Sequence, residues 1–319
     1  YGDTDYGRNR EGMADGLTHN RYIRYYWQGG LELSLMMLDH FAFTGDEQFA
    51  RQTLLPLAVE IMTFFDQHWE RRDGKIHFEP AMALETYNTA VNPLVEIVAI
   101  RKLGEELLAL PKNLTTAEQR AQWQRLIGEL PPVPTRQING QTVLIPAETY
   151  SGKQNSENPE LYAVFPYRRY CLGTPNLEIG RRTYANRAVK RTGGWSQDAI
   201  KAALLDLTDE ARNMVVSNAR SKHGPSRFPA FWGPNFDWVP DQCHGSVTMI
   251  ALQRMLLQYD GDRIHLLPAW PKDWDVDFKL HAPMQTLIEG RFEGGKLMDL
   301  KVTPESRRKD LVIGRQSSQ

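Results

Sequence analysis

Paired amphipathic segments joined by short turns constrain the fold of this chain more than any other feature. Apolar residues recur at helical spacing from Gly29 to Phe43 and again from about residue 47 to Trp69. Thr44-Gly45-Asp46 separates the two segments, so they predict a helical hairpin. The same spacing predicts further helices at 92–110, from Thr116 (with the capping-box spacing to Gln119), and at about 175–191, 196–206 and 209–221. Strands do not alternate with these helices, which excludes a parallel α/β sheet.

The pattern changes near the C-terminal end of the chain. Short apolar segments occur at 264–267, 276–280, 286–292 and 297–302, and they predict strands. Asn139-Gly140 between Ile138 and Gln141 predicts a two-residue hairpin further upstream. The stretch 76–88 is expected to be irregular. We therefore predict a mainly α chain, with a helical-hairpin region over 1–262 and a small β-domain over 263–319.

Composition excludes several classes of partner. Lys and Arg number 38 against 39 Asp and Glu, a net charge of −1, so no overall field favours nucleic acid or an anionic membrane. No apolar run approaches the length of a membrane span. The two cysteines offer neither a disulfide framework nor zinc spacing. We expect no metal and no cofactor.

One proline-rich segment, residues 227–245, carries a candidate binding surface. Three prolines and a glycine between 229 and 240 rule out regular structure there. The segment brings Trp232, Asp241 and His244 to the start of a helix predicted by the apolar spacing of 247–256. Aromatic faces beside carboxylates suit carbohydrate, because rings cover the C–H faces of sugars and carboxylates take hydroxyls or protons. The alternative is an aromatic-rich loop packed on a core.

Several segments resemble family-95 glycoside hydrolases. The longest is MLLQYDGDRIHLLPAWPKDW, residues 255–274. Asp241 and Gly245 match an Asp and a Gly of the family's Asp-Gly-Asn-Phe-Gly motif, and FAFTGDEQF at 41–49 matches a helical turn. The resemblance implies a six-hairpin glycosidase, an (α/α)6 toroid with α-L-fucosidase or α-L-galactosidase activity. It also implies that this chain is the C-terminal portion of that fold.

The same resemblance implies a pair of catalytic carboxylates. When Pro80 is aligned with the family's first proline in this region, Glu85 falls on the general acid, and Asp241 falls on the base-side carboxylate. In the family that Asp polarises two asparagines of an Asn-x-Asn motif, which this sequence lacks. The resemblance therefore implies a missing N-terminal part as a partner, or an Asp241 that takes the proton from water directly. Without the resemblance, both residues read as solvated surface carboxylates.

Polar and aromatic residues near these positions are predicted to bind substrate hydroxyls. Glu160 stands where the family has His, which departs from fucose specificity. Each of these residues has a structural alternative, as a hydrogen-bonding group or core aromatic. The predicted substrate-binding residues are Asn88, Asn158, Glu160, Trp232 and His244.

The resemblance therefore implies an inverting glycoside hydrolase that removes terminal α-linked, fucose- or galactose-like sugars from complex glycans or plant polysaccharides. The resemblance implies a secreted or periplasmic enzyme. Two alternatives stay open. A polysaccharide lyase on a helical toroid would use the Tyr-Arg-Arg-Tyr run at 167–170 with His244. A non-catalytic glycan-binding protein would keep the aromatics without the carboxylate pair.

Overall fold

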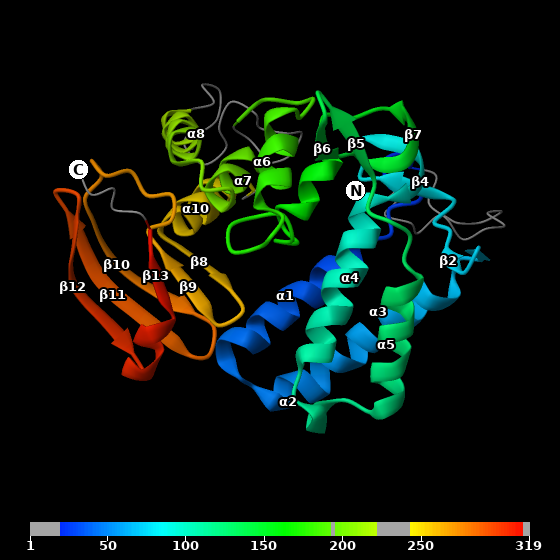
Figure 1. The fold of residues 1–319 in the computed structure, drawn as a ribbon, viewed down its shortest axis with the longest axis horizontal. Coiled ribbons are helices and arrows are strands. Elements are labelled where there is room, and N and C mark those ends of the chain that lie inside the picture. The colour runs from blue at the N-terminus through cyan, green and yellow to red at the C-terminus, as the bar shows by residue number, and fades with distance from the viewer. Residues whose placement is uncertain (1–19, 193–194, 222–242, 315–319) are drawn as a thin grey trace. The chain divides into compact units, whose positions relative to one another are not determined.

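The computed structural model describes residues 20–192, 195–221 and 243–314. The chain divides into two compact units (Figure 1): unit 1 is Tyr1–Phe41 with Asp46–Arg169, and unit 2 is Ala42–Gly45 with Tyr170–Gln319. More of the described residues lie in helices than in strands, which confirms the mainly helical character. The closed toroid stays a prediction. So does the domain boundary after residue 262, a position inside unit 2.

Helices form most of unit 1, and they match the predicted segments closely. The residues from 47 to 67 are one helical run with a π-helical turn in its middle, capped by the Asp46 carboxylate, which accepts from the Phe49 backbone N–H at 2.9 Å. The Thr116–Gln119 capping box is present. The helices are α1 (Gly29–Thr44), α2 (Glu47–Phe49), η1 (Ala50–Leu54), α3 (Leu55–Gln67), α4 (Leu94–Ala109), η2 (Lys112–Leu114), α5 (Ala117–Glu129) and η3 (Pro159–Ala163).

Close packing of these helices produces the core of unit 1. A Cβ added at Gly30 of α1 would lie 2.4 Å from Ile61 Cδ1 of α3. One added at Gly104 of α4 would lie 2.7 Å from Ile127 Cδ1 of α5, and Figure 1 shows these two helices side by side. Trp123 on α5 is completely buried, which by itself contributes a few kcal/mol of hydrophobic free energy. Small residues therefore set how closely the helices approach.

Strands also occur in unit 1, and one group of them contradicts a prediction. The Asn139-Gly140 hairpin is confirmed, with φ of 50° and 74° at the two turn residues. The stretch 76–88 was expected to be irregular, which is wrong: it holds strands of an antiparallel sheet with the order β3-β4-β7. The strands are β1 (Arg71–Arg72), β2 (Lys75–Ile76), β3 (Ala81–Ala83), β4 (Tyr87–Pro93), β5 (Thr135–Ile138), β6 (Gln141–Leu144) and β7 (Ala147–Lys153).

Unit 2 combines helices with two three-stranded sheets. All four C-terminal strands predicted from sequence are present, whereas the helix predicted at 175–191 ends at Ala185. The helices are α6 (Leu177–Ala185), α7 (Asp198–Leu204), α8 (Thr208–Arg220), α10 (Cys243–Leu256) and η4 (Glu305–Asp310). The strands are β8 (Leu257–Asp260), β9 (Arg263–Leu266), β10 (Val276–Ala282), β11 (Thr286–Glu293), β12 (Lys296–Thr303) and β13 (Leu311–Ile313).

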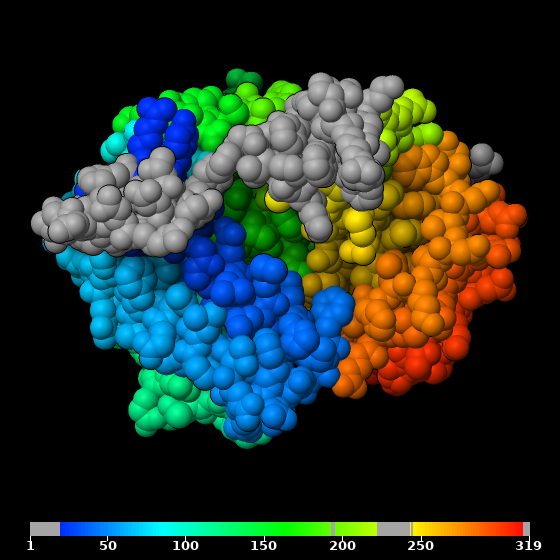
Figure 2. Space-filling view, turned by 180° about the vertical axis from the view of Figure 1, so that it is seen from behind, coloured from blue at the N-terminus to red at the C-terminus, as the bar shows by residue number. Residues whose placement is uncertain are grey.

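The two sheets of unit 2 share one apolar cluster. Alternate residues of β10 and β11, such as Phe278, Ile288 and Phe292, are buried in it together with Ile264 and Leu266 of β9. Strand β13 pairs in parallel with β9, and β10, β11 and β12 pair antiparallel. Figure 2 shows these last three strands, orange to red, as one continuous area of surface. Their outer face carries cross-strand ion pairs such as Lys279–Glu289.

Candidate functional site

Glu85 lies on the turn between β3 and β4 in unit 1. The preceding residue, Leu84, has φ of 50°, in the left-handed region that bulky residues rarely adopt, and its side chain is fully buried. Such strain costs about 1–3 kcal/mol and persists only where the surroundings fix it. All three residues of β3 are buried as well. Buried apolar side chains thus fix the turn, and Glu85 on this turn is half-buried.

Hydrogen bonds tie this turn to the segment that follows β7. Asn155 Nδ2 donates to Glu85 Oε2 at 3.0 Å. The Thr86 hydroxyl donates to Glu157 Oε2 at 3.0 Å and accepts from the Glu157 backbone N–H at 3.1 Å. Gln154 N donates to the Thr86 carbonyl at 2.9 Å. The buried Thr86 therefore holds Glu157, and Asn155 from the same segment holds the carboxyl group of Glu85, the residue before Thr86.

Further carboxyl and phenol groups belong to the same cluster. Burial raises the pKa of Tyr26, and the charges of Glu32, Glu157 and Glu85 raise it further. The pKa of Tyr162 is also raised well above its usual value by burial, then by Tyr26 and by the same three carboxylates. Burial, followed by the charge of Glu157, raises the pKa of Glu32 to about 7. We call Glu32, Glu85, Glu157, Tyr26 and Tyr162 the carboxyl cluster.

Glu96, a further carboxyl group, is completely buried near this cluster. Glu96 on α4 has no exposed surface, and burial raises its pKa to about 8, with the charge of Glu32 adding to the effect. Neither of its carboxyl oxygens meets a hydrogen-bond partner on another residue of the described part. The pKa of the buried Tyr167 is raised by burial and then by Glu32 and Glu96. Glu96 is therefore protonated and uncharged at neutral pH.

The predicted substrate-binding residues of unit 1 have different surroundings. Asn88 on β4 packs against β7, where a Cβ at Gly152 would lie 1.8 Å from Asn88 Oδ1. Asn158, which is 5% exposed, precedes η3, and its carbonyl accepts from the Leu161 N–H. Glu160 is buried, and its charge raises the pKa of Tyr87 after the larger effects of burial and Tyr150. Asn88 and Glu160 therefore lie close to the β4–β7 pair, and substrate binding by Asn88, Asn158 and Glu160 stays a prediction.

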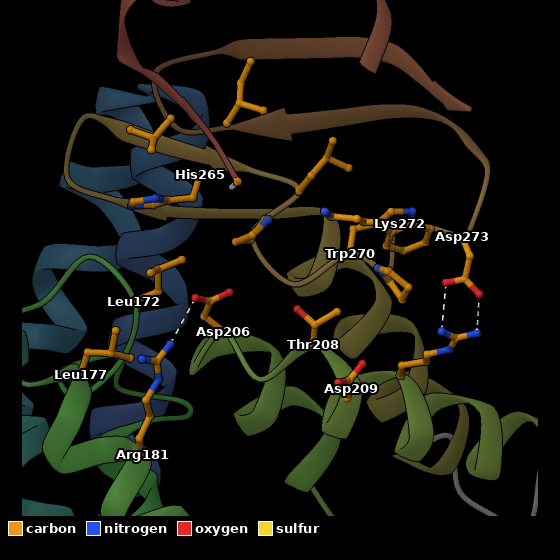
Figure 3. Close-up of a pocket in the computed structure, with 17 residues that line it drawn as sticks. Leu172, Leu177, Arg181, Asp206, Thr208, Asp209, His265, Trp270, Lys272 and Asp273 are labelled. Carbon is orange, nitrogen blue, oxygen red and sulfur yellow. Dashed lines mark hydrogen bonds and ion pairs between the residues drawn. The ribbon is translucent and has the colours of Figure 1, made fainter. Parts of the chain in front are cut away.

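The side chains of the other three predicted residues, Trp232, Asp241 and His244, lie outside the described part of the structure. Asp241 and Trp232 lie outside the described residues. His244 lies in α10, and its side chain is outside the described part. The pairing of Glu85 with Asp241 therefore stays a prediction. A cavity of about 720 Å³ in unit 2 (Figure 3) is lined by none of the four predicted residues whose side chains the structure describes, Glu85, Asn88, Asn158 and Glu160.

Sequence reasoning did not select Glu32 or Glu96, although both leave a signal. Glu96 interrupts an otherwise apolar run, Leu94-Val-Glu-Ile-Val-Ala-Ile100, inside a predicted helix. Glu32 directly follows the buried Leu31 on the first turn of α1. A carboxyl within a buried helical stretch costs free energy unless it is protonated or paired, so such a position points to function. Glu157 has no comparable local signal.

Two properties of the described residues bear on other classes of function. No group of three or more His, Cys, Asp or Glu side chains among them has a metal-binding arrangement. None of the helices in the described ranges combines the length and apolar character needed to cross a membrane.

Among known proteins, this chain is similar in fold to solved structures. No protein-family model matches the chain, and no curated protein matches it. A solved structure described as "Putative kojibiose phosphorylase from human microbiome" matches with a TM-score of 0.52 and 12% identity, over 86% of this chain and 49% of that one. This chain thus spans about half the length of that structure. The fold is therefore similar to that of this structure, while the assignment to family 95 gains no specific support.

Proposed function

We propose that this chain is part of an enzyme that cleaves α-glycosidic bonds, with Glu85 as its general acid. The observation that carries the proposal is the placement of Glu85 on a strained, buried turn within the carboxyl cluster. A general acid must be held within reach of the leaving oxygen, and the buried turn with the Asn155 contact fixes the position of the Glu85 carboxyl group. The likeness of the fold to a carbohydrate-active enzyme supports this chemistry over other uses of paired carboxyls.

The proposed reaction is hydrolysis with inversion. Glu85 gives its proton to the leaving oxygen as the bond between that oxygen and the anomeric carbon breaks. Asn155 Nδ2 donates to Oε2 of this carboxyl group and helps to fix its position. A water molecule adds to the opposite face of the sugar, and Asp241 accepts its proton. The substrates proposed are terminal α-L-fucosides or α-L-galactosides of complex glycans or plant polysaccharides.

Phosphorolysis is a second candidate, favoured by the structural neighbour described as a kojibiose phosphorylase. In that reaction inorganic phosphate forms the new bond to the anomeric carbon in place of water, and the product is a sugar 1-phosphate. The role of Glu85 stays the same, because the leaving oxygen needs a proton in both reactions. The carboxylate that activates water in hydrolysis has no corresponding task with an anionic nucleophile.

The test incubates the protein with α-L-fucosides, α-L-galactosides and kojibiose, with and without phosphate. Proton NMR of the first product gives its anomeric configuration, and detection of a sugar 1-phosphate separates phosphorolysis from hydrolysis. Products that absorb in the ultraviolet through a new double bond would instead indicate a lyase. A glycan-binding protein would give no product at all.

The role of Glu85 is tested by Glu85→Gln, with the exposed Glu60→Gln as control. Loss of general acid catalysis is expected to lower turnover of a natural glycoside by about 100-fold or more. Turnover of an aryl glycoside with an activated leaving group should fall much less, since that leaving group needs little protonation. A loss of less than about tenfold on the natural glycoside would show that Glu85 is not the acid, and Glu157→Gln would be examined next.

A further inference from the structure

Unit 2 contains a cavity whose walls come from several separate segments of its chain. The cavity has a volume of about 720 Å³, within the range of small-molecule sites. Arg181 comes from α6, Thr208 and Arg212 come from the start of α8, and Trp270 with Asp273 comes from the segment after β9. Figure 3 shows Arg181, Thr208, Trp270 and Asp273 among the side chains that line it. All of them belong to unit 2, so the site is complete within one compact body.

Six charged residues line the cavity, three basic and three acidic, and four of them form two ion pairs. Arg212 makes a two-bonded contact with Asp273, at 2.9 and 2.7 Å. Arg181 Nη2 donates to Asp206 at 3.1 Å, while its Nε donates to the Leu205 carbonyl at 2.8 Å. Figure 3 marks both ion pairs with dashed lines. Each pair presents fixed donors beside fixed acceptors with little net charge, an arrangement that suits hydroxyl groups, which both donate and accept.

An aromatic and apolar surface faces the same space. The half-buried Trp270 lines the cavity, and its orientation is fixed because its Nε1 donates to the Trp274 carbonyl at 2.8 Å. Val312 and Ile313 of β13 contribute exposed apolar surface, at 45% and 44% exposure. Such surfaces cover the C–H faces of a sugar ring.

One polar atom in the cavity wall, Nε2 of His265, lacks a hydrogen-bond partner among the described residues. His265 of β9 is 8% exposed, and its Nε2 has no hydrogen-bond partner among the residues the structure describes. Its pKa is lowered, mainly by burial and then by the charge of Arg263, so the ring is neutral at neutral pH. Figure 3 places His265 near Leu172, at the end of the cavity away from Trp270. A neutral imidazole is a suitable partner for an uncharged ligand.

We propose that this cavity is a second binding site, which takes a neutral carbohydrate. Balanced ion pairs disfavour a strongly anionic or cationic ligand, and the combination of Trp270 with paired hydrogen-bonding groups matches a sugar with one apolar face. The site goes beyond the proposed cleavage reaction, because it includes neither Glu85 nor any other member of the carboxyl cluster. It would hold a carbohydrate chain without cleaving it.

The test is isothermal titration of the whole chain with kojibiose and with maltotetraose, and with a galacturonate trimer as the charged comparison. Saturable binding of a neutral sugar is expected, with a dissociation constant on the order of 1 mM or tighter. Trp270→Ala and Arg212→Met should each weaken that binding at least tenfold. Arg291→Met is the matched control, since Arg291 forms a similar ion pair with Asp277 on the exposed β10–β11 surface.

Three results would overturn the proposal: no saturable binding of either neutral sugar, equal binding by both cavity variants and wild type, or tighter binding of the galacturonate trimer. Because Arg212 is partly exposed, Arg212→Met keeps the test valid if Trp270→Ala fails to fold. Glu85→Gln should bind the neutral sugar as wild type does. That result would show that sugar binding at this cavity does not depend on Glu85, so failure of the cleavage proposal and failure of this proposal can be told apart.

Discussion

At the scale of single residues, Thr86 explains how the candidate site keeps its shape. Its side chain is fully buried and makes both of its hydrogen bonds to Glu157, one with the carboxylate and one with the backbone N–H. Thr86→Val keeps the shape of the side chain and removes both bonds. Leaving these partners unsatisfied should destabilise the protein by about 1–3 kcal/mol, measured by urea denaturation, and lower activity by displacing Glu157.

Two further variants make this prediction specific. Thr86→Ser retains the hydroxyl and should recover most of the stability and activity. Thr89→Val removes an exposed hydroxyl whose contact, with the adjacent Asn88, is long at 3.4 Å, and should change stability by less than about 0.5 kcal/mol. Equal effects of Thr86→Val and Thr89→Val would contradict a role for the Thr86–Glu157 contacts.

Some of the candidate residues could be predicted from the sequence and others could not. Glu85 was selected by resemblance, since its own sequence surroundings contain no catalytic pattern. Its neighbours Asn155 and Glu157 lie about seventy residues away in the chain. Such proximity comes from the pairing of β4 with β7, which no local pattern encodes. Glu96, by contrast, is visible in the sequence as a charge inside an apolar helix.

At the scale of elements, periodicity located the helices well and the internal sheet poorly. The boundaries of α1, α4, α5 and α8 fall within a few residues of those predicted, because each has its own apolar stripe and termination signals. Strands β3 and β4 went unrecognised. These short segments become strands through hydrogen bonds to each other and to Ala147–Lys153, a partner remote in sequence.

Glycines inside two helices give a prediction at this scale. A Cβ at Gly180 of α6 would lie 2.0 Å from the Tyr170 carbonyl oxygen, a backbone atom that cannot move aside cheaply. Gly180→Ala should therefore destabilise the protein by about 1–3 kcal/mol. A Cβ added at Gly128 of α5 would meet nothing within 4 Å, so Gly128→Ala should be neutral or stabilise by up to about 1 kcal/mol. Urea denaturation of both variants checks the opposite signs.

At the scale of the whole molecule, the protonation of unit 1 makes stability depend on pH. The pKa values of Glu32 and Glu96 are raised in the folded protein to about 7 and about 8, from an ordinary value of 4.5. Between pH 4.5 and 8 the folded state therefore binds more protons than the unfolded state, so stability falls as pH rises. The contribution is fully present below pH 4.5 and is lost as pH passes through the folded-state values.

Glu96→Gln tests this dependence, because glutamine is uncharged at every pH. Each such group contributes a slope of about 1.4 kcal/mol per pH unit across its window. The free energy of unfolding of the variant should therefore fall less steeply than that of wild type between pH 5 and pH 8, and the difference between them should grow in favour of the variant. Taking this difference cancels other groups, such as His265, whose lowered pKa acts with the opposite sign. The exposed Glu293→Gln should follow the wild-type curve. Parallel curves for Glu96→Gln and wild type would show that Glu96 is ionised in the folded protein.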